Sequence, residues 1–219
     1  MRIKPILARL QNAMGCQGLT EEMVLWSPIS STPKSTKSTI DLVIAYNRSP
    51  NSQTALDLTL WIAHQTVLAT QKQVLVHIVY VLEDERSRQS PDTLPNSWEL
   101  KSLTSIPART RQGTTEPQPR VTKVESCCFN AIFYHPKHWE QADQILWQAR
   151  SLVYEWGGTC NAHLRLGNVA QELKSVVESE AAELLFLGCS SVRHPLVQQL
   201  SRDFPCPILG IPHSLAVVA

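Results

Sequence analysis

The sequence has little of what two large functional classes of protein require. Its lysines and arginines (20) and its aspartates and glutamates (19) nearly cancel, so it lacks the positive field that non-specific nucleic-acid binding needs. No apolar run approaches the roughly 20 residues of a membrane-spanning helix. The sequence therefore predicts a protein that neither binds nucleic acid nor carries a transmembrane segment.

The six cysteines form no Cys-x-x-Cys motif, and no secretory leader precedes them. Cys127 and Cys128 are interpreted as a partly buried thiol pair, because adjacent cysteines bridge only with strained geometry. His135 and His138 have a spacing seen in metal sites, but Glu140 is their one evident neighbouring partner, which favours solvated loop histidines. We expect a cytoplasmic protein with no metal site.

Common signatures of nucleotide binding and catalysis are also missing. The chain has no GxGxxG, GxxxxGK[ST], HExxH or GxSxG motif, which removes the dinucleotide, phosphate-loop, zinc-protease and hydrolase-elbow patterns. No catalytic residue is predicted, and the protein is not expected to be an enzyme.

What the sequence does contain is an alternation of strand and helix patterns. Residues 40–46 form a short apolar run rich in β-branched residues, and a second such run lies at 74–81; both predict buried strands. Between them, Ser49 can cap a helix while Pro50 occupies its first position, where the missing N–H costs nothing. These three elements predict a βαβ unit.

The alternation resumes after a long interruption with an amphipathic helix at 139–156. The elements expected after it are strands at 161–166, 184–187 and 208–211, a helix that begins at Asn168, and a short helix at 196–202. Five strands alternating with four helices predict an α/β fold with a doubly wound parallel sheet in the order 3-2-1-4-5.

Three segments fall outside this pattern. Residues 1–39 begin with a short amphipathic stretch and end in a Ser/Thr/Pro/Lys linker, and residues 213–219 form a tail. Residues 83–137 form a proline-containing insertion, whose length indicates a functional excursion or disorder. The expected α/β domain therefore spans 40–212.

The expected strand order locates a candidate binding crevice. In an open α/β sheet, ligands bind outside the carboxyl ends of the strands, where the winding direction reverses. That point lies between the first and fourth strands, whose following loops lead toward helix N-termini that can receive an anion. The alternative is that these loops are ordinary capped turns. The residues assigned to the crevice are Asn47, Arg48, Ser49, Val81, Gly188, Ser190, Ser191 and Arg193.

Several short motifs occur in an order that is typical of one protein family. Residues 49–56 match a Ser-x-x-Ser-x-x-Ala-Leu helix start. Residues 167–170 resemble a Gly-x-Pro-Ala turn, and residues 204–209 resemble a closing Cys-Pro-Val-Leu strand. Together they resemble the universal stress protein family over about 40–82 and 140–212. The Asn-Arg-Ser turn and the N-terminal helix are similar to those of cyanobacterial members.

The resemblance implies a Rossmann-like fold of the adenine-nucleotide alpha-hydrolase kind. It also implies a non-catalytic regulatory module of stress response that senses a nucleotide or binds a protein partner. Members that bind ATP carry an acid at the end of strand one and a Gly-x2-Gly-x9-Gly-Ser/Thr loop after strand four. Here Asn47 replaces the acid, Ser191 replaces the second glycine, and His194-Pro195 replaces the last pair in a shortened loop. Because phosphate needs close backbone approach, we expect ATP or AMP to bind weakly.

Two other functions stay open on the sequence alone. A slow ATPase or nucleotide hydrolase in the same crevice is disfavoured by the uncharged Asn47, since phosphoryl transfer needs metal and charge stabilisation. A scaffold that docks through a helix within residues 1–15 is the other. The resemblance also implies a homodimer through residues 208–211, a strand expected at the sheet edge.

Overall fold

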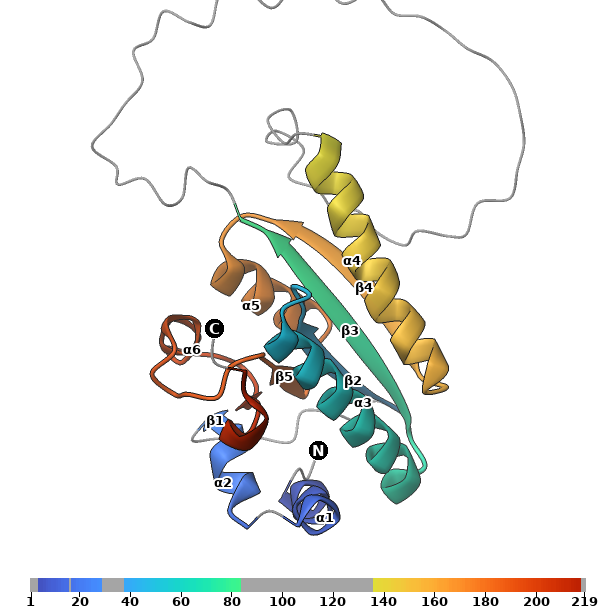
Figure 1. The fold of residues 1–219 in the computed structure, drawn as a ribbon, viewed down its shortest axis with the longest axis vertical. Coiled ribbons are helices and arrows are strands. Elements are labelled where there is room, and N and C mark those ends of the chain that lie inside the picture. Colours follow the sequence, from blue (N-terminus) through green and yellow to red (C-terminus); the bar gives the residue numbers. More distant parts are fainter. Residues whose placement is uncertain (1–3, 16, 29–37, 84–135, 218–219) are drawn as a thin grey trace, which may run out of the picture.

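The computed structural model (Figure 1) describes four stretches of the 219-residue chain: 4–15, 17–28, 38–83 and 136–217. The expected insertion lies outside them except for its first residue and its last two, and so do Cys127, Cys128 and His135. Among the helices that the structure describes, none has the length and apolarity that a bilayer span requires.

Five parallel strands form most of the sheet: β2 (Thr39–Ala45), β3 (Gln73–Leu82), β4 (Thr159–Leu166), β5 (Leu184–Phe186) and β6 (Ile208–Leu209). They lie in the order β4-β3-β2-β5-β6, and each neighbouring pair is parallel. Numbered among themselves along the chain, these strands have the predicted order 3-2-1-4-5. The prediction of a doubly wound α/β fold is confirmed.

Helices cover both faces of the sheet. Because successive side chains of a strand point to opposite faces, β2 contributes to the core on each side. Leu42 and Ile44 belong to the core beneath α3 (Pro50–Thr70) and α4 (Pro136–Glu155). Val43 belongs to the opposite core, beneath two further helices, α5 (Val169–Ser179) and α6 (Pro195–Leu200). Burial on both faces explains why the central strands are continuous apolar runs.

Two helices begin where the capping residues predict. At α3, the Ser52 N–H donates to Ser49 Oγ at 3.2 Å, and Pro50 occupies the first turn. At α5, the Gln171 N–H donates to Asn168 Oδ1 at 3.2 Å. Both caps satisfy amide donors that have no partner inside the helix. They fix two helix starts at the carboxyl end of the sheet.

The N-terminal segment shares the core of the α/β domain. Its first helix is α1 (Lys4–Met14), and a short helix, α2 (Leu19–Met23), follows it. Both contribute to the core cluster that also holds α3, so the expected boundary at residue 39 divides residues that pack together. The apolar stripe proposed for docking on a partner is turned inward. Its buried residues are Ile6, Leu7 and Leu10.

A sixth strand, β1 (Val24–Trp26), pairs antiparallel with β6 on the side away from β5. Just beyond β6, the Gly210 N–H donates to the Met23 carbonyl oxygen at 2.8 Å. The prediction that residues 208–211 lie at the sheet edge is therefore wrong, because the chain's own N-terminal strand covers that edge. The homodimer itself stays a prediction, but a second copy could pair with β6 only after β1 had been displaced.

We expect Leu7→Ala to lower the free energy of unfolding by about 2–5 kcal/mol, because Leu7 is 0% exposed in the shared core. Urea denaturation of both proteins measures the difference. Leu68 on α3 is 61% exposed, so Leu68→Ala is the matched control and should change stability by less than about 0.5 kcal/mol. Equal effects of the two substitutions would show that α1 is not part of the core in solution.

Candidate functional site

A crevice of about 450 Å³ opens at the carboxyl ends of β2 and β5, within the range of small-molecule sites. Strand ends line it through Ala45, Val81 and Leu187, and the starts of α3, α5 and α6 border it. The winding of the sheet reverses at this point, since β3 lies on one side of β2 and β5 on the other. The crevice thus lies where the predicted strand order locates it.

The structure brings half of the predicted site residues together. Asn47, Ser49, Val81 and Gly188 line the crevice. Arg48, whose φ of 65° is uncommon for a residue other than glycine, lines a separate groove beside Trp147 of α4. The remaining three residues follow β5 but are not among the described residues that line the crevice: Ser190, Ser191 and Arg193.

The turn after β2 is held by its own polar groups. Asn47 Oδ1 accepts a hydrogen bond from the Ser49 N–H at 3.1 Å, and the Asn47 N–H donates to Ser52 Oγ at 3.4 Å. The Ser52 hydroxyl in turn donates to the Ser49 carbonyl oxygen at 2.9 Å. The side-chain oxygen of Asn47 therefore stabilises the turn. Its NH₂ group is the part of the side chain that can donate to a ligand.

Gly188 lies where the loop after β5 meets the start of α3. A Cβ atom at this position would lie 2.6 Å from the Ser52 nitrogen and 2.8 Å from the Asn51 carbonyl carbon. No side chain fits between the two backbones, so Gly188 has a packing role. This close contact holds the two loops of the crevice against each other.

The start of α6 offers few donors to an anion. Pro195 has no N–H group, and the Leu196 N–H donates to His194 Nδ1 at 3.3 Å. The imidazole of His194 thus occupies a donor that a phosphate group would otherwise take. His194 also lines the crevice. Because its side chain accepts the Leu196 N–H, the start of α6 has one backbone donor fewer for an anion.

Sequence reasoning missed several crevice residues, because they come from segments that meet only in the folded chain. Burial raises the pKa of the Cys189 thiol to about 12, so this thiol is not a nucleophile near neutral pH. Burial also raises the pKa of the Tyr80 hydroxyl. Neither group carries charge into the crevice. The crevice residues absent from the sequence assignment include Tyr46, Tyr80, Val169 and Leu196, and Cys189 and His194, which belong to the loop after β5, also line the crevice.

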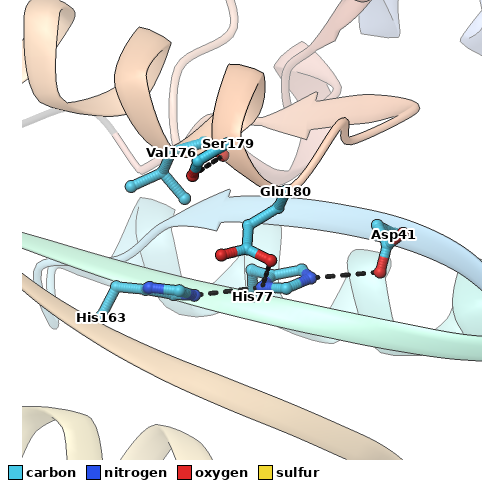
Figure 2. Close-up of polar contacts among 6 residues, drawn as sticks. All are labelled: Asp41, His77, His163, Val176, Ser179 and Glu180. Atoms are coloured by element: carbon cyan, nitrogen blue, oxygen red, sulfur yellow. Dashed lines mark hydrogen bonds and ion pairs between the residues drawn. The ribbon is translucent and has the colours of Figure 1, made fainter. Parts of the chain in front are cut away.

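A second polar cluster lies on the face of the sheet covered by α5, away from the crevice (Figure 2). At its centre His77 of β3 is 0% exposed. Its Nε2 atom lies 3.3 Å from Asp41 Oδ1, and its Nδ1 atom lies 3.0 Å from His163 Nε2. Glu180, which follows α5, brings Oε2 to 4.0 Å from His77 Nδ1. No motif predicted this cluster, since its members are far apart in the sequence.

The imidazole of His163 has a strongly lowered pKa, about 4 against an ordinary value of 6.5. Burial is the largest cause, followed by the neighbouring His77 ring and by the positive charge of Arg165. Desolvation and like charge both disfavour the protonated ring. His163 is therefore neutral in the folded protein near neutral pH.

This shift predicts that the folded state loses stability in mild acid. Between about pH 6.5 and pH 4 the unfolded chain binds a proton at residue 163 that the folded chain does not, so stability falls as pH falls through this window. Urea unfolding at several pH values with a chelator present measures the effect. His163→Gln should flatten the profile, whereas His64→Gln, on an exposed part of α3, should not. Identical profiles for wild type and His163→Gln would contradict the prediction.

The fold defines this chain as an α/β protein with a doubly wound sheet and a crevice at the reversal of its strand order. A solved structure with this fold belongs to a hypothetical protein whose biochemical function was assigned from its structure. That protein is 12% identical, with a TM-score of 0.50, over 79% of this chain and 95% of the other. At this identity the likeness concerns the fold alone.

Members of the universal stress protein family are also among the structural neighbours. One from Burkholderia pseudomallei is 16% identical with a TM-score of 0.44, over 81% of this chain and 99% of its own. One from Arabidopsis thaliana, solved with AMP bound, is 13% identical with a TM-score of 0.45, over 79% and 91% of the two chains. No protein-family model and no curated protein sequence matches this chain.

Proposed function

We propose that this chain is a cytoplasmic regulatory protein of the universal stress type, which binds an adenine nucleotide weakly and does not turn it over. The observation that carries the proposal is the crevice of about 450 Å³ at the reversal of the strand order. Proteins with this topology bind ligands at that position. Residues 49–56, which resemble the universal stress protein family, form the helix start beside the crevice. This resemblance supports an adenine nucleotide as the ligand.

The base and ribose side of the crevice is intact. Apolar side chains of Ala45, Val81 and Leu187 lie at the strand ends, and Val169 lies at the start of α5. Apolar side chains beside polar groups suit a purine ring, which has an apolar face and a polar edge. The polar groups come from the turn at Asn47, whose NH₂ group is available as a donor.

The phosphate side is weakened. Pro195 lacks an N–H group, and His194 takes the Leu196 N–H. The other helix start, at α3, already gives its Ser52 N–H to Ser49. We therefore expect a triphosphate to gain little affinity over a monophosphate, because the backbone donors that would hold the additional phosphates are missing or engaged.

The proposal of a binding protein without turnover depends on the charges in the crevice. Asn47 supplies an amide where phosphoryl transfer would need a carboxylate to hold a metal ion. Of the described residues that line the crevice, the acidic one is the exposed Glu83, just beyond β3. The nucleotide-hydrolase alternative has no specific observation in its favour. The alternative of a scaffold that docks through α1 is disfavoured, because the apolar side chains of α1 that would contact a partner are buried.

Calorimetric titration with ATP and with AMP tests the phosphate side. We expect weak affinities that differ by less than about tenfold, or about 1.4 kcal/mol. Arg48 and Arg193 are the two exposed cations beside the helix starts that could replace lost amide donors. ATP affinity at least tenfold above that of AMP, lost in Arg48→Ala or Arg193→Ala but retained in the exposed control Arg202→Ala, would overturn this expectation and assign the phosphate site to those arginines.

A second experiment tests whether the crevice is the binding site at all. Val169→Trp adds a large ring at the wall of the crevice, and we expect it to reduce AMP affinity by at least tenfold. Val67→Trp is the matched control, because Val67 is 40% exposed on α3 and outside the crevice. Unchanged AMP binding in folded Val169→Trp protein, or no AMP binding to the wild type at millimolar concentration, would contradict the proposed function.

A further inference from the structure

Three metal-ligating side chains converge on one point of the sheet, outside the crevice (Figure 2). His77 comes from β3, His163 from the edge strand β4, and Glu180 from the residue after α5. One ring nitrogen of each histidine and one carboxylate oxygen of Glu180 lie within 4.8 Å of one another. The three groups come from three separate elements, so the fold itself brings them together.

The partner on the far side of His77 determines which nitrogen can bind a ligand. Asp41 Oδ1 lies 3.3 Å from His77 Nε2, and an ionised carboxylate can only accept a hydrogen bond. The proton of a neutral His77 ring is therefore on Nε2. This leaves the lone pair of Nδ1 directed toward His163 and Glu180. A carboxylate that holds a histidine in this way is the usual outer support of a metal-bound imidazole.

The distances suit a tetrahedral metal ion. Two nitrogens bound at about 2.0–2.1 Å in tetrahedral geometry lie about 3.3 Å apart. His77 Nδ1 and His163 Nε2 are 3.0 Å apart, and His77 Nδ1 and Glu180 Oε2 are 4.0 Å apart. Shifts of less than 1 Å would place all three atoms around one ion. Without metal, His163 donates its Nε2 proton to His77, which accounts for the shorter distance.

The charges around the cluster also favour a cation. Asp41 and Glu180 supply two carboxylates, and Glu180 lies at the C-terminal end of the 11-residue helix α5, where the helix dipole attracts positive charge. Arg165 of β4 is the opposing cation near His163. The Glu180 side chain is 35% exposed. This exposure gives solvent and ions a route to a cluster whose central histidine is fully buried.

We propose that His77 Nδ1, His163 Nε2 and Glu180 bind one zinc ion, with Asp41 as the positioning residue behind His77. Two imidazoles and one carboxylate form a donor set that zinc uses when it keeps a fourth position for water. Other divalent transition metals accept the same donors. Sequence spacing predicted no metal site, because it addresses only histidines that are close together in the sequence. This cluster lies outside that prediction, since its two histidines are 86 residues apart.

Zinc titration of the full chain, freed of metal by a chelator and kept reduced without thiols, tests the site. A chromophoric zinc chelator reports the affinity by competition, and Co²⁺ reports tetrahedral ligation through its visible absorption. We expect Glu180→Gln and His163→Gln to weaken zinc binding at least tenfold and to abolish the Co²⁺ absorption. Glu178→Gln on the exposed side of α5 is the matched control and should bind like the wild type.

Asp41→Asn separates positioning from ligation. It leaves all three ligands in place but removes the carboxylate behind His77, and we expect a 10–100-fold loss of zinc affinity. The metal-free thermal midpoints of all variants check that they are folded. The proposal is overturned if the wild type binds zinc no more tightly than folded Glu180→Gln and His163→Gln, or if Glu178→Gln loses as much affinity as Glu180→Gln. Because no nucleotide is involved, this outcome is independent of the crevice.

Discussion

The burial of β2 on both faces and along both edges is the constraint on which the rest of the structure depends. Leu42 and Ile44 contribute to one core and Val43 to the other, while β3 pairs along the whole of β2 on one side and β5 pairs with residues 42–44 on the other. A parallel strand in this position must have its crossovers run to opposite sides. Its carboxyl end is consequently the place where two loops diverge, and the crevice forms between them.

The N-terminal segment covers a sheet edge that the five parallel strands alone would leave exposed. Without β1, the outer side of β6 would present unpaired backbone groups, and such edges invite pairing with other chains. The segment covers this edge and places α1 over the core beside α3. The segment that covers this edge therefore also buries its own apolar stripe on α1. Any self-association must use a different surface or release this segment.

The crevice and the histidine cluster use the same strands in different ways. The crevice takes residues at and beyond the carboxyl ends, where polar turns meet apolar strand ends. The cluster places His77 within an otherwise apolar buried strand. A buried polar ring costs free energy unless its nitrogens have partners. Asp41 and His163 meet that requirement, because Asp41 lies 3.3 Å from one ring nitrogen of His77 and His163 lies 3.0 Å from the other.

The local sequence determined the strands and the helix starts, because apolar runs, the Ser49 and Asn168 caps and Pro50 act within a few residues. Their order determined the sheet topology and hence the position of the crevice. Only the tertiary structure decided the rest. The three residues of β1 become a strand only through pairing with β6, and His77 and His163 meet only because β3 and β4 are neighbours. Such contacts depend on register between distant segments, which no local pattern encodes.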